Sequence, residues 1–155
     1  RARLMSAAFE HFSEWALVGT DYTRHWMPTG VSWSPEHTDI TNEYLVQGVA
    51  GGVPLILAFV GILYLCFRKI GAVYSQSDAR TAFVLWVLGV ALFSHSITFF
   101  SVGYFDQIFV VFYSLVAAIA SYTNCHDKSV LQSHEESSEQ ILAQPEVGDK
   151  TAISQ

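Results

Sequence analysis

The stretch GVPLILAFVGILYLCF, residues 52–67, contains no charged side chain. Extended back to Val49 it comprises nineteen residues. A helix of that length rises by about 28 Å, close to the roughly 30 Å hydrocarbon core of a lipid bilayer. Of the 155 residues of the chain, 51% are hydrophobic and only 14% are charged, and this charged share is about half that of a typical soluble domain. The stretch therefore predicts a transmembrane helix.

Two more apolar stretches follow along the chain. Residues 81–102 have His95 as their single ionisable group, and residues 104–122 carry Asp106 near their start. Apolar runs of this length are rare in soluble cores. We therefore expect an all-α integral membrane protein with three transmembrane helices, at about 49–67, 81–102 and 104–122.

Basic residues set the expected orientation. The connection between the first two stretches, RKIGAVYSQSDAR at 68–80, holds three of them. Short loops rich in Lys and Arg stay in the cytoplasm, so residues 1–51 are expected outside the cell and the tail inside it. From residue 125 the tail holds two lysines against six carboxylates, so residues 123–155 are expected to be a disordered, acidic cytoplasmic tail. Nucleic acid is excluded as a partner, because the chain lacks a basic patch.

The predicted external loop, residues 1–51, begins with an amphipathic pattern. In RARLMSAAFEHFSEWAL, residues 1–17, apolar side chains recur at helical spacing. This predicts a helix that lies on the membrane surface or on a neighbouring helix. Residues 18–39 are rich in Gly, Pro, Thr and aromatic residues and are expected to form an irregular loop. Within it, Arg24 and His25 are candidates for binding an anion, with ordinary solvated side chains as the alternative.

A second, polar helix is expected where the loop meets the first transmembrane stretch. Ser34 or Asp39 can cap it, and His37 and Thr41 share one of its faces because they are four residues apart. Ionisable groups held at a membrane boundary are costly, so this helix is a candidate functional site. The glycines that follow permit a bend or a close backbone approach; they are Gly48, Gly51 and Gly52.

Two longer segments resemble a known family. They are DITNEYLVQGVAGGVPLILAFVGILYLCFRKIG, residues 39–71, and WVLGVALFSHSITFFSVGYFDQIFVVFYSLVAAI, residues 86–119. Both are similar to the C-terminal part of O-antigen ligase and O-antigen polymerase-like membrane proteins. The resemblance covers most of residues 1–122 and implies the C-terminal fragment of a multi-spanning protein. In this family His, followed by Asn, Ser or Gln, precedes a glycine motif; Asn42 fits that pattern, whereas Thr41 stands in the place of the histidine.

The resemblance implies transfer of a glycan from an undecaprenyl-diphosphate carrier to an acceptor hydroxyl on a polysaccharide or a lipid. The reaction takes place at the outer face of the bacterial inner membrane, without a metal or other cofactor. It needs positive charge for the leaving diphosphate and a base near the acceptor. Arg24 and Arg3 are the expected diphosphate ligands, and His37 is the expected base. The remaining residues expected to contact substrate are Asp39, Thr41, Asn42 and Tyr44.

Two polar residues of the transmembrane region allow more than one interpretation. His95 and Asp106 either line the cavity that receives the carrier or form hydrogen bonds within the helix bundle. If they relay protons, the chain is part of a small-solute transporter instead; a non-catalytic membrane scaffold is a further alternative. Cys66 and Cys125 are far apart and lack a matching histidine pattern, so we expect neither a disulfide nor a metal site.

Overall fold

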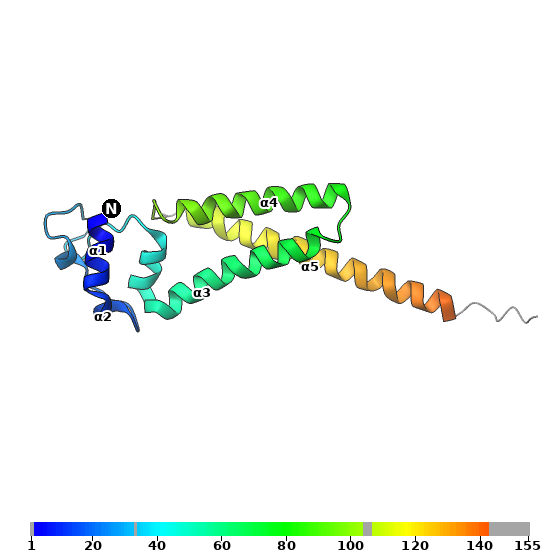
Figure 1. The fold of residues 1–155 in the computed structure, drawn as a ribbon, viewed down its shortest axis with the longest axis horizontal. Helices are drawn as coiled ribbons and strands as arrows, with labels where there is room; N and C mark the ends of the chain where they lie inside the picture. Colours follow the sequence, from blue (N-terminus) through cyan, green and yellow to red (C-terminus); the bar gives the residue numbers. More distant parts are fainter. Residues whose placement is uncertain (1, 33, 104–106, 143–155) are drawn as a thin grey trace, which may run out of the picture.

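The computed structural model describes residues 2–32, 34–103 and 107–142. Three long helices form a bundle, and a group of short helices packs at one end of it (Figure 1). We call this group, residues 2–32 and 34–41, the cap. The helices are, in chain order, α1 (Ala2–Glu10), α2 (Phe12–Trp15), the 3-10 helix η1 (Arg24–Trp26), α3 (Glu43–Tyr74), α4 (Ala79–Thr98) and α5 (Gln107–Leu142). The described chain is all-helical, as the sequence predicted.

The three long helices pack along a seam of apolar side chains. Buried residues follow each other at intervals of four and three along α3, and at intervals of seven along the other two helices. Such spacing keeps one stripe of each helix turned toward its neighbours. α4 runs antiparallel to α3 and α5, and each helix contacts the other two. The seam consists of Phe59, Leu63, Cys66, Ile70, Val73, Leu85, Leu92, Phe99, Phe112 and Ile119.

Outside the seam, the long helices present large apolar side chains to their surroundings. Leu57 is 66% exposed, Phe83 65% and Val110 66%. Apolar surface of this extent is unusual in a water-soluble monomer, whereas lipid solvates it. All three helices are long and apolar enough to cross a membrane. The described chain therefore has three helices with the length and the apolar surface that are typical of membrane-spanning helices.

The first membrane helix is longer than predicted at its C-terminal end. α3 continues to Tyr74, through Arg68 and Lys69, because Ile70 and Val73 extend the buried seam. Both basic side chains are exposed, and Lys and Arg are good helix formers whose charged ends reach water. The connection expected at this point shrinks to the short turn between α3 and α4.

The second membrane helix is shorter than predicted. α4 ends at Thr98 rather than at residue 102, and the chain then turns toward α5. The turn is closed by backbone hydrogen bonds from Ser101 and Val102 to the carbonyl of Thr98, at 2.8 Å and 2.9 Å. Residues 104–106, the expected start of the third membrane helix, lie outside the described residues.

α5 extends into the segment that was expected to be a disordered tail. The helix runs on to Leu142, so the part of the expected disordered tail that begins at residue 123 is helical as far as the structure describes it. The sequence contains neither Gly nor Pro between Gly103 and Pro145, and therefore nothing interrupts a helix that starts in the apolar region. Residues 143–155 lie outside the described residues.

α3 bends sharply near its start, at the glycines that the sequence singled out. The pair at 51–52 has non-helical backbone angles, and Gly52 adopts a positive φ of 71° that favours glycine. The bend leaves backbone N–H and C=O groups of α3 without helical partners, and these groups form hydrogen bonds with the cap. Thr20 N–H donates to the carbonyl of Val49 at 2.8 Å, and Val53 N–H donates to the carbonyl of Ala16 at 2.8 Å. We call this contact between residues 16–20 and 49–53 the elbow junction.

Glycine is required on both sides of the elbow junction. A Cβ atom at Gly52 would lie 2.6 Å from the carbonyl carbon of Leu17. A Cβ at Gly19, where φ is 83°, would collide with the carbonyl oxygen of Val49. A third glycine, Gly48, receives the indole ring of Trp15, which would lie 2.8 Å from an added Cβ. The predicted bend and the predicted close backbone approach are both confirmed.

α3 begins later than predicted. Its N-cap is Asn42, whose Oδ1 accepts a hydrogen bond from Leu45 N–H at 3.0 Å, and neither Ser34 nor Asp39 starts a helix. The chain before Asn42 pairs with the preceding loop instead. The carbonyl of Glu36 accepts hydrogen bonds from the backbone of residues 23 and 24, and Ser32 and Thr38 form an isolated β-bridge.

This pairing corrects a prediction about the site. His37 and Thr41 both lie outside the helices, so they do not share a helix face. The physical reason is that backbone groups in this segment find partners across the loop, so they are not free to form helical hydrogen bonds.

The cap has a small core of its own. The predicted single helix over residues 1–17 is divided at His11 into α1 and α2. Phe9 is 68% exposed and Phe12 44%, so the apolar face of this segment is only partly covered. The buried side chains of the core are Leu4, Ala8, Trp15, Trp26 and Leu45, the last contributed by α3.

Candidate functional site

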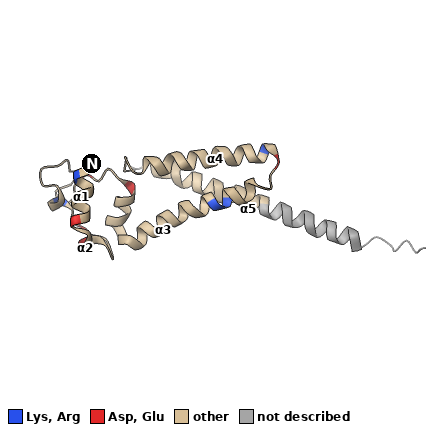
Figure 2. Cartoon of the chain, viewed as in Figure 1, with Lys and Arg blue, Asp and Glu red and all other residues tan. Residues whose placement is uncertain are grey.

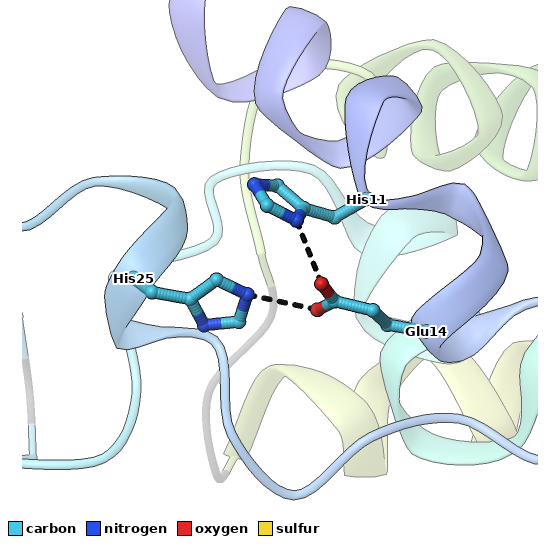
Figure 3. A group of neighbouring side chains, drawn as sticks. All are labelled: His11, Glu14 and His25. Atoms are coloured by element: carbon cyan, nitrogen blue, oxygen red, sulfur yellow. Dashed lines mark hydrogen bonds and ion pairs between the residues drawn. The ribbon is translucent and has the colours of Figure 1, made fainter.

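Three side chains of the cap meet around one carboxylate (Figure 3). Glu14 Oε1 lies 2.7 Å from His11 Nδ1, and Glu14 Oε2 lies 2.8 Å from His25 Nε2. The indole N–H of Trp26 also donates to Glu14 Oε2, at 3.3 Å. We call His11, Glu14 and His25 the His-Glu-His cluster. The sequence singled out only His25 from this group.

Local backbone structure brings the cluster together. His11 sits at the break between α1 and α2, and Glu14 follows three residues later, a spacing that places both side chains on one side of a helical turn. His25 arrives from η1, which is closed by a hydrogen bond from Trp26 N–H to the carbonyl of Thr23 at 3.1 Å. Trp26 is 6% exposed and anchors η1 in the core of the cap.

Aromatic rings and hydrogen bonds define the environment of the cluster. The ring of His11 stacks on Trp26, and the ring of Tyr22 stacks on His25, with centroids 6.1 Å and 5.2 Å apart. The hydrogen bond from His11, supported by those from Trp26 and His25, holds the pKa of Glu14 below its ordinary value. The side chains remain 32% exposed at His11, 39% at Glu14 and 34% at His25, so all three are reachable from solvent.

The cluster has two chemical capabilities. A carboxylate that accepts from an imidazole orients the ring and supports its use as a base. Two imidazoles and a carboxylate are also a common ligand set for transition metals. The pair His11 and Glu14, which the sequence analysis did not single out, could have been recognised from its spacing of three residues. The third member, His25, joins through the fold of a loop that no periodicity predicts.

The predicted diphosphate ligands differ in their surroundings. Arg24 is half-buried, and its guanidinium donates to the carbonyls of Gly30 at 3.0 Å and Pro28 at 2.6 Å. These bonds hold the loop after η1 in place. Arg3 lies on α1 with its side chain exposed, which leaves it accessible to an anion.

The predicted base, His37, lies in a segment of the cap whose backbone pairs with the segment that contains Arg24. Ser34 Oγ is 3.0 Å from His37 Nδ1 and accepts a hydrogen bond from the backbone N–H of His37 at 3.1 Å. The backbone N–H of Arg24 donates to the carbonyl of Glu36 at 3.0 Å. Arg24 and His37 therefore belong to adjacent segments.

Two predicted substrate-binding residues join the start of α3 to the end of α4. Asn42 Nδ2 donates to the carbonyl of Phe100 at 3.2 Å. Tyr44 Oη donates to the carbonyl of Ser96 at 3.0 Å. Carbonyl groups near the end of a helix lack intrahelical partners. The side chains of Asn42 and Tyr44 donate the missing hydrogen bonds. The geometry gives both residues a positioning role at the point where the cap meets the bundle.

The other predicted residues are more dispersed. Asp39 and Thr41 are half-buried in the segment that leads to α3. His95 is half-buried on α4, with its ring 5.8 Å from that of Phe112 in the seam. Asp106 lies outside the described residues. The structure thus brings Arg24 and His37 onto segments whose backbones pair with each other. It places Asn42 and Tyr44 where the start of α3 contacts the end of α4.

One further residue was not singled out by the sequence analysis. Glu43, the first residue of α3, is 0% exposed. Its Oε1 accepts a hydrogen bond from Gln47 Nε2 at 2.7 Å, and its backbone N–H donates to the carbonyl of Phe99 at 2.8 Å. A carboxylate withdrawn from water at the end of a membrane helix is costly and often functional. Its burial by the end of α4 is a tertiary contact that the local sequence does not reveal.

No protein-family model matches the chain, and no curated protein or solved structure is significantly similar to it.

Proposed function

We propose that the chain is part of a membrane enzyme that transfers a glycan from an undecaprenyl-diphosphate carrier, as a ligase or a polymerase, in the bacterial inner membrane. The observation that carries the proposal is the elbow junction. It fixes a polar cap to one end of an apolar bundle through main-chain hydrogen bonds of 2.8 Å. The segment with this junction is also the one that resembles the O-antigen ligase family.

The architecture suits a substrate with one charged and one apolar part. The diphosphate of such a carrier stays at the membrane boundary, whereas its polyprenyl chain stays in the hydrocarbon. Among the residues coloured in Figure 2, the charged ones lie in the cap, at the start of α3 and around the turn between α3 and α4, with long uncharged stretches of helix between them. A cap at the boundary can therefore hold the charged group while the apolar helix faces contact the chain.

Two residues carry the proposed chemistry. Exposed Arg3 binds the diphosphate, because a guanidinium offers paired N–H donors to phosphate oxygens and stabilises the charge that develops on the leaving group. His37 accepts the proton of the acceptor hydroxyl, with its ring oriented by Ser34 at 3.0 Å. Arg24 shapes the loop beside His37 through its bonds to two carbonyls.

The test is complementation of a deletion strain. Surface polysaccharide is compared by gel electrophoresis after the strain receives the wild-type gene or a variant at equal expression. We expect the deletion to lose or shorten the glycan, and we expect Arg3→Ala and His37→Ala to fail to restore it. The matched control is Arg80→Ala, which removes an exposed arginine at the far end of the bundle and restores the glycan.

Two outcomes separate the function from the site. An unchanged glycan in the deletion strain removes the proposed function. Full restoration by both Arg3→Ala and His37→Ala, in a strain whose deletion does alter the glycan, removes the two residue assignments and leaves the function.

A further inference from the structure

We propose that the His-Glu-His cluster is a binding site for a divalent transition metal ion of the Zn²⁺ class. The inference is independent of glycan transfer. It rests on the convergence of three metal-ligating side chains from α2, η1 and the break before α2.

The distances fit a site that closes around an ion. One potential ligand atom from each side chain lies within 4.8 Å of the others. In a tetrahedral zinc site with bonds of 2.0 to 2.1 Å, neighbouring ligand atoms are about 3.3 Å apart, so side-chain shifts of about 1 Å are sufficient. All three side chains are partly exposed, and rotations of this size do not disturb the core of the cap.

The donor set indicates the class of metal. Two imidazole nitrogens and one carboxylate oxygen suit Zn²⁺, Co²⁺ or Ni²⁺ rather than Mg²⁺ or Ca²⁺, which prefer oxygen ligands. Three protein ligands leave at least one coordination position for water or for an anion from solvent. Since the cluster is about one third exposed, with values of 32% to 39%, that position is accessible.

Metal binding changes which ring nitrogens of the two histidines carry a proton. In the structure His11 and His25 each donate an N–H to the Glu14 carboxylate, at 2.7 Å and 2.8 Å. A metal ion takes the place of these two protons, and each ring then carries its proton on the other nitrogen.

The second nitrogen of His25 limits the affinity. Nδ1 is buried and has no hydrogen-bond partner among the described residues. In the metal-bound form this nitrogen carries a proton, and an N–H without an acceptor is costly. Metal ligands without such a supporting partner bind about 10 to 100 times more weakly. We therefore expect an affinity well below that of closed structural zinc sites.

The experiment uses the protein that contains these 155 residues, purified in detergent or nanodiscs. Zn²⁺ is titrated by calorimetry, and Co²⁺ is titrated while visible absorption reports its coordination. The variants are His11→Ala, Glu14→Gln and His25→Ala. Glu14→Gln keeps an oxygen that can accept from Trp26, so the cap stays folded. The matched control is His126→Ala, which removes an imidazole from α5.

We expect the wild type and His126→Ala to bind one Zn²⁺ and to give the same Co²⁺ spectrum. Each cluster variant should lose at least about tenfold in affinity and lose that spectrum. Hydrogen exchange of the elbow junction without metal shows whether a variant is folded. If the wild type binds no ion, or if any folded cluster variant binds as tightly as the wild type, the three-ligand site is excluded.

Discussion

Asn42 Nδ2 lies 3.2 Å from the carbonyl oxygen of Phe100, a residue 58 positions further along the chain. The other side-chain atom of the same amide, Oδ1, caps α3 by accepting from Leu45 N–H at 3.0 Å. A single amide thus fixes the start of one membrane helix to the end of the next. Asn42 is therefore, in this fold, a clamp between two helices.

Removal of this clamp should lower stability in two steps. Ser caps a helix as well as Asn does but cannot reach Phe100, so Asn42→Ser should cost about 1 kcal/mol for the lost hydrogen bond. Asn42→Ala should cost about 1 kcal/mol more, because the cap is lost too. Thermal unfolding in detergent gives both values. Equal stability of the Ser and Ala variants would contradict the capping role.

A second prediction follows from the positive φ of Gly52. Gly52→Ala should destabilise the elbow junction by about 3 kcal/mol or more, since the added Cβ meets Leu17 at 2.6 Å and the backbone angle disfavours any other residue. Hydrogen exchange of the amides of Thr20 and Val53, which bridge the junction, should become fast.

The control for this experiment is a glycine in the same helix. A Cβ at Gly61 meets no atom within 4 Å, so Gly61→Ala should leave the exchange of both amides unchanged. Fast exchange in both variants would indicate that α3 itself, and not the junction, is sensitive.

The carboxylate of Glu14 gives the cap a pH dependence. Its pKa is lowered in the folded chain, first by the hydrogen bond from His11. A lowered folded pKa means that the contribution to stability is complete above the ordinary value of about 4.3 and is lost as the pH falls from there through the folded pKa.

We therefore expect the unfolding temperature of the cap to fall with pH below about 4.3. In Glu14→Gln this acid-dependent component should be reduced, because an amide does not titrate. Tryptophan fluorescence, with Trp15 and Trp26 buried in the cap, follows the transition between pH 7 and pH 3. An identical acid dependence in the two proteins would show that other groups cause it.

Orientation in the membrane is testable through cysteine. Cys125 is exposed on α5. The basic residues that flank the turn between α3 and α4 are Arg68, Lys69 and Arg80, and they predict that this end of the bundle lies in the cytoplasm. In a Cys66→Ala background, a membrane-impermeant maleimide should label Cys125 only after permeabilisation.

The complementary probe is Ser13→Cys, at an exposed position in α2, in a variant without the two natural cysteines. It should be labelled in intact spheroplasts. Labelling of the two sites in the reverse order would place the cap in the cytoplasm and would end the proposal of chemistry at the outer face.

The sequence predicted the membrane helices because hydropathy over long windows does not depend on tertiary contacts. It also predicted a bend or a close backbone approach at the cluster of Gly48, Gly51 and Gly52, because glycine tolerates backbone angles that other residues rarely adopt. The end of α3 could not be found in the same way. Its last turns contain Arg68 and Lys69, and a hydropathy criterion ends the predicted span before these charged residues. Ile70 and Val73 nevertheless continue the buried seam.

The candidate site was less predictable, for a physical reason. His37 was expected on a helix, but backbone pairing of Glu36 with Arg24 prevents helix formation there. This pairing and the meeting of His25 with Glu14 are loop closures. They depend on how the cap packs as a whole, and no local spacing encodes them.

The elbow junction is made of main-chain atoms, and this bears on how such a protein can evolve. Peptide groups are the same in every sequence, so mutation cannot remove their hydrogen bonds directly unless it introduces proline. Natural selection can therefore vary the exposed residues of the cap while its attachment persists. The attachment restricts the side chain at Gly19 and Gly52, where a Cβ would collide with backbone atoms across the junction. We therefore expect homologous sequences to keep these two glycines while the surrounding loop diverges.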